Sequence, residues 1–469
     1  MYAHVQYPDT IEPQVQFVEE TAPEDIVEKT IEQLRNGVSL EEMCIASALA
    51  VIRSSEIPFF PTGQWGHHGG HLHPISGLHA VRETASRLPG ARRFLPVVQN
   101  VALSNKHIHD PAMGPYLLPE FVPLDAGGVA ETKQAFFDAV RRGSVNIADH
   151  HFLWLVQNLP PDQSLDVLLT VAIPKNLMDD HKFIYPIYTW RLLDWIDSGY
   201  FQVLVRGPVR YISQPPSANP VEKVVALIEE YQLLDKPLRQ QTGADEAESI
   251  MQAREAMNAN FEDLPEITAR ALADGLSLEG TSEALTLAAS NLFLRLDTEN
   301  PMDVHMQTAC NVRHHLLGLK GVSAENKISA LLLWNSGPEV RNATNRLAPD
   351  HQPHPDTVAA IPSHSQARFL DTIHDAIAAN DVEGAIAHVA KYGELEYETQ
   401  PLIALLAEIA CQDNITEMHS IKHHQACVEA FMYTRAPFRF RHLIAASKAA
   451  AVSYGKARDV YERANPLLN

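Results

Sequence analysis

Four histidines at the start of predicted helices have a spacing that points to metal chemistry. The segments are HPISGLHAVRE from His73, HKFIYPIYTWR from His181, HMQTACNVRHH from His305 and HSIKHHQACVE from His419, and successive histidines lie 108, 124 and 114 residues apart. Imidazole is a good ligand for Fe, Zn, Cu and Ni. If the segments are equivalent parts of a repeated fold, their imidazoles can converge on one transition-metal ion.

A lysine follows the fourth of these histidines. Lys422 lies three residues after His419, so the two side chains share one face of a helix. The other segments carry Ser76, Ile184 and Thr308 at this position. One interpretation is a surface lysine whose ammonium group reaches water. The other is a buried lysine, in which desolvation and a nearby cation favour the neutral amine; such an amine takes up CO2 to form a carbamate, an anionic oxygen ligand.

Other histidines compete for the same role. His71 and His79 flank the first candidate, and His423 and His424 follow the fourth. A lone histidine on a helix is more often a core or surface residue than a ligand, so the choice among them stays open. Neither a His-Glu-x-x-His motif nor paired Glu-x-x-His motifs occur, and a metal site must therefore be assembled from distant parts of the chain.

The elements that would carry these residues are predicted to be helices. Apolar residues recur at spacings of three and four in segments such as EEMCIASALAVI, SEALTLAASNLFLRL and PLIALLAEIA, which is the helical period. The best strand candidate is FQVLVRGPVRYI at residues 201–212, which could also be a short extended connector.

Internal similarity predicts a repeated architecture. EQLRNGVSLEEMCIASALAVI and ARALADGLSLEGTSEALTLAA each contain a helix that ends at a glycine, Gly37 or Gly275, before the same Ser-Leu-Glu start of the next helix. Weaker copies surround Gly143 and Gly393. We therefore predict an all-α, HEAT-like helical-repeat array that encloses a central site. It would be one domain, residues 1–469, with four repeats at approximately 20–115, 126–212, 220–345 and 358–460.

Composition limits the classes of partner. The chain of 469 residues carries 37 Lys and Arg against 58 Asp and Glu, a net charge of −21, which disfavours binding to nucleic acid. The four cysteines form no Cys-x-x-Cys pair. The N-terminal segment is polar and no apolar run approaches the length of a membrane span. We expect a soluble cytoplasmic protein without a membrane partner; its oligomeric state does not follow from the sequence.

The C-terminal stretch MHSIKHHQACVEAFMYTRAPFRFRHLIAASKAAA resembles the terminal pattern of the questin oxidase-like family, helical-repeat oxygenases found with aromatic polyketide pathways. The shared features are His-x-Ile-Lys, an Ala-Cys-x-Glu helix and a Leu-Ile-Ala-Ala helix. HLHPISGLHAVRETA and DVHMQTACNVRHHLLGL also resemble the histidine helices of that family.

The resemblance implies an all-α oxygenase that cleaves C–C bonds or opens rings of anthraquinone-type substrates. One branch of the family holds non-haem iron through four histidines and a carboxylated lysine. That ligand set corresponds here to His73, His181, His305, His419 and Lys422, with Fe(II) as the expected ion and another transition metal as the alternative. Lys422, His305 and His419 are also the predicted catalytic residues.

The predicted reaction uses O2 and an aromatic or polycyclic phenol- or quinone-type substrate. Two further sets of side chains have two interpretations each. The first set is three acids, which either orient the imidazoles or complement helix dipoles: Asp180, Asp303 and Glu417. The second set is four aromatic residues, which either form core or line a substrate pocket: Phe183, Tyr185, Tyr188 and Trp190. The rival functions are a zinc-dependent or metal-free enzyme and a non-catalytic scaffold that binds protein.

Overall fold

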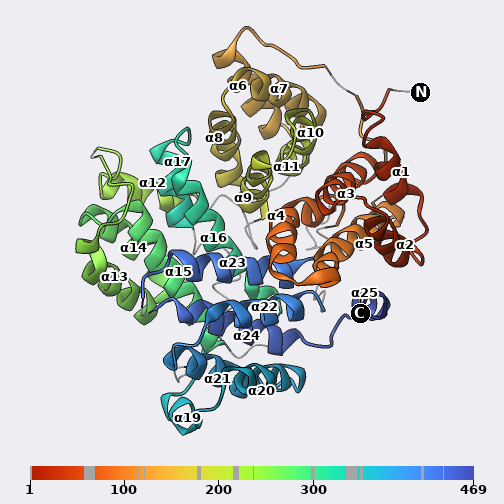
Figure 1. Cartoon of the computed structure of the whole chain (residues 1–469). Helices are drawn as coiled ribbons and strands as arrows, with labels where there is room; N and C mark the ends of the chain where they lie inside the picture. Colours follow the sequence, from red (N-terminus) through yellow and green to blue (C-terminus); the bar gives the residue numbers. More distant parts are fainter. Residues whose placement is uncertain are drawn as a thin grey trace. The chain divides into compact units, whose positions relative to one another are not determined.

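The computed structural model describes residues 3–57, 69–113, 116–120, 122–176, 181–214, 221–235, 237–296, 301–333, 346–348, 352–412, 417–436 and 438–468. These residues form helices joined by turns and short loops (Figure 1), and their only β-type pairings are two isolated bridges, His4 with Pro119 and Leu296 with Leu347. The all-α, helical-repeat prediction is confirmed. The chain divides into two compact units, and each is described by itself.

The first unit contains residues 1–175, 182–218 and 458–469. Its elements are α1 (Glu12–Glu20), α2 (Ile26–Arg35), α3 (Leu40–Ser54), α4 (Leu72–Arg87), η1 (Gly90–Phe94), α5 (Leu95–His109), α6 (Val129–Arg141), α7 (Val145–Asn158), α8 (Pro161–Ala172), η2 (Ile173–Lys175), α9 (His181–Trp190, assigned to this unit from Lys182), η4 (Arg191–Asp194), α10 (Ser198–Leu204), α11 (Arg206–Ser213), α25 (Asp459–Ala464) and η9 (Asn465–Leu467). Helix α3 is buried from Met43 to Arg53 because α1, α4 and α5 pack around it.

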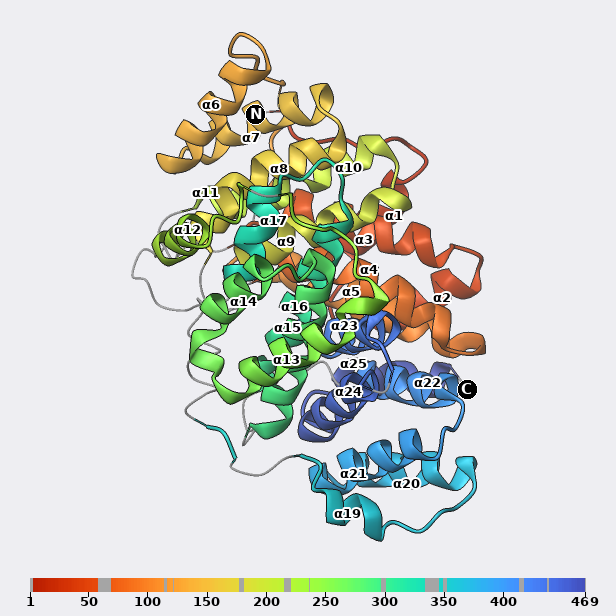
Figure 2. The ribbon, with the colours of Figure 1, turned by 90° about the vertical axis from the view of Figure 1, so that its left-hand side faces the viewer.

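The second unit contains residues 176–181 and 219–457. Its elements are α12 (Val221–Glu230), η5 (Ala244–Glu246), α13 (Ala247–Ala259), η6 (Phe261–Asp263), α14 (Leu264–Ala273), α15 (Leu278–Arg295), η7 (Pro301–Val304), α16 (His305–Gly318), α17 (Ala324–Leu332), α19 (Pro355–Ala360), α20 (Gln366–Ala378), α21 (Val382–Glu394), α22 (Thr399–Ala410), α23 (His419–Tyr433) and α24 (Phe440–Ser453). Helix α15 packs against α13, α16 and α24, and α23 packs against α16 and α24. Figure 2 shows α20 and α21 side by side as one helical pair.

Three helix pairs share one type of connection. Gly37, Gly143 and Gly275 follow α2, α6 and α14 with φ of 107°, 68° and 102°, a backbone conformation that glycine adopts without a Cβ clash. In each case the next N–H closes a Schellman turn: Val38 N to Gln33 O, Ser144 N to Ala139 O, and Leu276 N to Ala271 O. The predicted helix ends at these glycines are confirmed.

The fourth copy has a helix end near its glycine, but with a different turn. Gly393 is the second-last residue of α21, which ends at Glu394, and Glu396 just beyond it has φ of 53°. Glu396 N donates to the carbonyl of Gly393, and α22 begins at Thr399. An added Cβ at Gly393 would come within 2.6 Å of the Phe440 ring, so this glycine also permits close packing with α24.

Residues 201–212 are helical, and the strand or extended interpretation of this segment is wrong. The segment lies in α10 and α11. The physical reason is that Arg206 and Arg210 both reach Asp149 on α7: four residues rise about 6 Å along a helix, which brings the two side chains to one carboxylate, but about 13 Å along a strand. Among the described helices, none is long and apolar enough to cross a membrane.

The boundary between the units, at residues 218 and 219, falls between the second and third predicted repeats. The first unit therefore holds the first two predicted repeats except residues 176–181, and the second unit holds the last two except residues 458–460. The limits of the four repeats, and the enclosure of a central site, stay predictions.

Candidate metal centre

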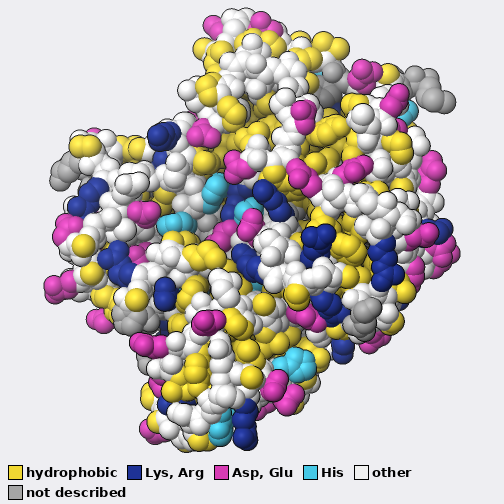
Figure 3. All heavy atoms as spheres, viewed as in Figure 1, with side chains coloured by type: hydrophobic (Ala, Val, Ile, Leu, Met, Phe, Trp, Pro, Cys, Tyr) yellow, Lys and Arg dark blue, Asp and Glu magenta, His cyan; other side chains and the backbone are white. Residues whose placement is uncertain are grey.

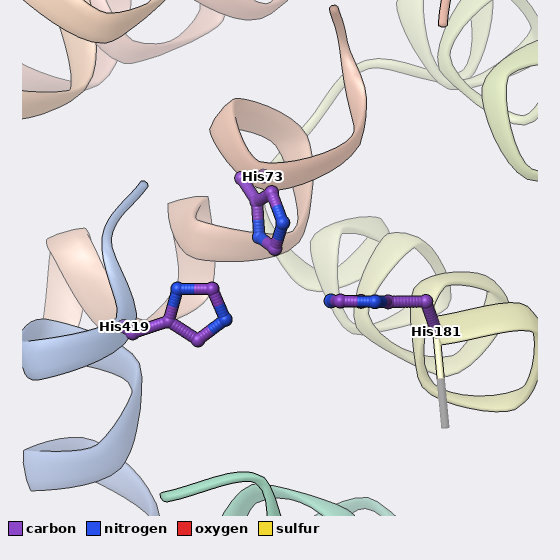
Figure 4. A group of neighbouring side chains, drawn as sticks. All are labelled: His73, His181 and His419. Carbon is purple, nitrogen blue, oxygen red and sulfur yellow. The ribbon is translucent and has the colours of Figure 1, made fainter. Parts of the chain in front are cut away.

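Three of the predicted ligands lie together in the second unit. His305 and His419 are the first residues of α16 and α23, and His181 is the first residue of α9. The ring centres are 4.6 Å apart for His305 and His419, 5.1 Å for His181 and His305, and 6.3 Å for His181 and His419. Figure 4 shows the imidazoles of His181 and His419 directed toward one another. We call His181, His305 and His419 the three-histidine cluster.

Ring nitrogens of the three-histidine cluster lie close together, and those of His181 and His419 are within 4.8 Å of one another. Nε2 of His305 and Nε2 of His419 are 2.9 Å apart. Two imidazoles bound at about 2.1 Å and about 90° apart around a metal would have their ligand nitrogens about 3.0 Å and their ring centres about 4.6 Å apart, and opposite imidazoles would have ring centres about 6.5 Å apart. The His305–His419 distances match those of neighbouring ligands of one ion, and a hydrogen bond between the two rings gives the same nitrogen separation.

The helix starts explain why these imidazoles converge. A side chain in the first turn leans toward the N-terminal end of its helix, so His305 and His419 extend beyond the ends of α16 and α23. Glu417 and Met418, directly before His419, both have positive φ, 54° and 69°. Left-handed backbone at two successive non-glycine residues is costly and often accompanies functional positions. Here it sets the direction from which the chain enters α23.

Lys422 is buried. It is 3% exposed and lies one helical turn after His419 on α23, so both side chains leave the helix on the same face. The interpretation of Lys422 as a surface lysine is therefore wrong.

His423 and His424 face other helices. Nε2 of His423 is 3.5 Å from Cys427 Sγ, and its ring lies 5.4 Å from that of Phe293 on α15. Burial lowers the pKa of His423 to about 3. Nε2 of His424 bonds to the carbonyl of Ile403 on α22 at 3.2 Å. Of the three candidates in this segment, only His419 lies in the three-histidine cluster.

The remaining candidates belong to the first unit. His73 is buried in the first turn of α4 and is labelled in Figure 4; its role as the fourth imidazole ligand stays a prediction. His71, the N-cap residue of α4, has Nδ1 2.8 Å from the Tyr185 hydroxyl and Nε2 3.3 Å from Glu56 Oε1. His79 Nε2 accepts from Arg191 Nη2 at 2.6 Å.

Sequence reasoning missed the buried charge network around His71. Arg206 binds Asp149 at 2.9 Å, and Arg210 binds Glu56 at 2.7 Å. Burial opposes ionisation of Glu56, but the hydrogen bond from His71 and the charge of Arg210 outweigh it and lower its pKa to about 2. The available signal was the pair of arginines four residues apart in an apolar segment, since buried arginines require carboxylate partners.

The acids predicted to orient imidazoles have mixed outcomes. Asp303 lies in the turn before α16, and its Oδ1 accepts from Arg346 Nη2 at 2.7 Å. Burial raises the pKa of Asp303, against the opposing effect of the Arg346 hydrogen bond and charge. Glu417 is half-buried, and Asp180 lies outside the described residues. The contact with Arg346 gives Asp303 a partner that the sequence did not suggest.

The aromatic residues of α9 have core contacts. The ring of Trp190 packs edge-on against that of Phe201 at 5.3 Å, and its indole N–H donates to the carbonyl of Pro161. Tyr185 is fully buried and pairs with His71. Phe183 and Tyr188 are also buried. For Trp190 and Tyr185 these contacts favour the core interpretation over that of a substrate-pocket wall.

Comparison of the chain with known protein families, with curated proteins and with solved structures finds no match. The resemblance to questin oxidase-like proteins therefore rests on the residues of this sequence.

Proposed function

We propose that the protein is a non-haem iron oxygenase acting on an aromatic phenol- or quinone-type substrate. The observation that carries the proposal is the 2.9 Å separation of the Nε2 atoms of His305 and His419, with the ring of His181 beside both. Iron fits this set because imidazole nitrogen is among its preferred ligands. Lys422, as a carbamate, and His73 complete the proposed ligand set.

The chain's own residues supply position and charge. Three neutral imidazoles bind the ion without offsetting its charge, so a nearby anion would stabilise the centre. The Lys422 amine supplies one by bonding its nitrogen to the carbon of CO2 and releasing a proton to solvent. Five protein ligands leave one position of an octahedral ion for exchange. When bound, the iron supplies the capacity to activate O2 toward an electron-rich ring.

The metal content of the purified protein tests this proposal. We expect iron near one equivalent in untagged protein prepared without added metal, and its loss in His305→Ala and His419→Ala. Two matched controls should retain iron. His424→Gln removes a buried histidine that bonds to the carbonyl of Ile403, and His374→Ala removes an exposed histidine. Folded wild-type protein without transition metal would overturn the proposal, as would variants that keep their iron.

The oxygenase activity needs a second measurement. A hydroxyanthraquinone added to the iron-loaded protein should cause O2 consumption that stops in His305→Ala. Stoichiometric zinc in place of iron would contradict the oxygenase and leave a zinc-dependent enzyme as the better explanation. Iron without O2 consumption across a panel of phenols and quinones would contradict the substrate class.

A further inference from the structure

The first unit contains a cleft that none of the predicted metal ligands lines. It has a volume of about 800 Å³ and lies among the end of α2, the start of α3, the second half of α4, η1 and Trp195. Small-molecule sites typically have volumes of about 300–1,000 Å³. Its basic lining residues are Arg35, Arg82 and Arg93. On the face drawn in Figure 3, Lys and Arg side chains gather around apolar surface over helices that Figure 1 colours red and orange.

The cleft is basic although the protein is acidic. Arg82 and Arg93 make no ion pair with any residue that the structure describes, and Arg35 donates to the backbone carbonyl of Leu467. Glu41 is the one carboxylate in the lining, so the formal charge of the lining is +2 in a chain of −21. Because Arg82 and Arg93 have no carboxylate partner among the described residues, both guanidinium groups are open to an anionic ligand, which arginine binds through two hydrogen bonds.

Aromatic rings accompany these arginines. The guanidinium carbon of Arg82 lies 5.5 Å from the ring centre of Trp195, and that of Arg93 lies 5.8 Å from the ring centre of Phe94. The indole N–H of Trp195 is buried without an acceptor among the described residues, in contrast to the N–H of Trp190, which donates to Pro161. Guanidinium groups stack on flat π-systems and bind carboxylates through two hydrogen bonds. The lining thus offers both contacts that a planar aromatic anion needs.

The cleft is distinct from the candidate metal centre. All of its lining residues belong to the first unit, whereas the three-histidine cluster belongs to the second. Arg82 follows His73 on α4 by nine residues, which at about 100° per residue places the two side chains on opposite faces of that helix. The inference therefore stands whether or not the proposed oxygenase function is correct.

We propose that this cleft binds a small planar aromatic carboxylate, with the carboxylate between Arg82 and Arg93 and the ring against Trp195 and the apolar side chains. Loss of both guanidinium groups removes the charge partners and leaves the apolar surface in place. Affinity for the anion should then fall much more than affinity for a neutral compound of the same shape.

Calorimetric titration of the full chain with 2-naphthoate and with neutral 2-naphthamide tests the proposal. We expect saturable binding of 2-naphthoate, at least tenfold tighter than 2-naphthamide. The double variant Arg82→Gln/Arg93→Gln should weaken 2-naphthoate at least tenfold and change 2-naphthamide less than twofold. Arg142→Gln removes an exposed arginine outside the cleft and should change neither. Circular dichroism melting confirms that each variant folds.

The proposal would be overturned by no saturable binding of 2-naphthoate to the wild-type chain, or by equal affinity for 2-naphthoate in the wild type and the double variant. His305→Ala separates this proposal from the proposed function, because it should lose iron and keep its 2-naphthoate affinity. Loss of 2-naphthoate binding in a folded His305→Ala variant would place the anion at the metal centre and overturn the cleft assignment.

Discussion

At the scale of single residues, the burial of Lys422 beside His419 leads to a chemical-rescue prediction. Lys422→Ala should lose iron and turnover, because it removes the proposed carbamate. Formate or acetate should restore both in part, since the shortened side chain leaves room for a free carboxylate. Lys422→Met fills the same space without an oxygen and should not be rescued. Metal analysis and O2 uptake with and without added carboxylate provide the readout.

The carbamate prediction has its own spectroscopic check. Protein exchanged into 13CO2-containing buffer should show a carbamate carbon signal in the wild type that Lys422→Met lacks. A Lys422→Ala protein with full iron content and normal turnover would show that Lys422 contributes no ligand.

The buried ion pair between Arg206 and Asp149 gives a stability prediction at the same scale. The two side chains are 2% and 3% exposed and 2.9 Å apart. Asp149→Leu should lower the free energy of unfolding by about 3–5 kcal/mol, because it leaves a buried guanidinium without its carboxylate. The double variant Arg206→Met/Asp149→Leu should lose less than the sum of the two single changes. Urea denaturation measures all four proteins; strict additivity would mean that the pair is not energetically coupled.

At the scale of helices, the two serine caps predict unequal effects of the same substitution. Ser39 accepts from Glu42 N in an exposed turn, whereas buried Ser277 accepts from Gly280 N and also donates to Glu246 at 2.8 Å. Ser39→Ala should cost about 1 kcal/mol of unfolding free energy. Ser277→Ala should cost about 1 kcal/mol more, because a buried hydrogen bond is lost as well. Urea midpoints compare the two, and equal costs would show that the Glu246 contact adds nothing.

The same helical connections show what local sequence can predict. The helix ends at Gly37 and Gly275 could be predicted from the sequence because a left-handed turn and a serine cap depend on only a few neighbouring residues. Near Gly393 the left-handed residue is Glu396, and the need for glycine at position 393 comes from the Phe440 ring, 47 residues away in the chain, which local sequence could not show. Residues 201–212 failed for a related reason: their β-like composition is overridden by the contacts of two arginines with Asp149.

At the scale of the whole molecule, the candidate site is formed by segments far apart in the sequence. The matching positions of the histidines in the aligned segments could suggest these contacts but not establish them. The positions of His305 and His419 in equivalent segments made them candidates, and the structure places their nitrogens together. The sequence could not choose between His419 and its neighbours His423 and His424, because that choice depends on which helices surround α23. The burial of Lys422 likewise depends on the packing of other helices against α23, which local sequence does not show.

The buried His442 predicts one contribution to the pH dependence of the stability of the molecule. His442 is fully buried, with Nδ1 2.9 Å from Ser290 Oγ and Nε2 2.8 Å from Thr434 Oγ1. Burial, assisted by the charge of Arg441, lowers the pKa of His442 to about 3. In the unfolded chain a histidine has a pKa of about 6.5. Above that value both states are neutral and stability is complete; below it the unfolded state alone gains a proton, so stability falls until the pH reaches about 3.

Many carboxylates also titrate in this range, so the contribution of His442 has to be isolated by comparison. His442→Gln should reduce the loss of unfolding free energy between pH 6 and pH 4 by up to about 1.4 kcal/mol per pH unit, the equivalent of one proton. His374→Gln removes an exposed histidine and should leave the pH dependence unchanged. The measurement is urea denaturation at half-unit pH steps. If wild type and His442→Gln lose stability in parallel, His442 takes up its proton in the folded state too, and the packing around Ser290 and Thr434 must tolerate an imidazolium.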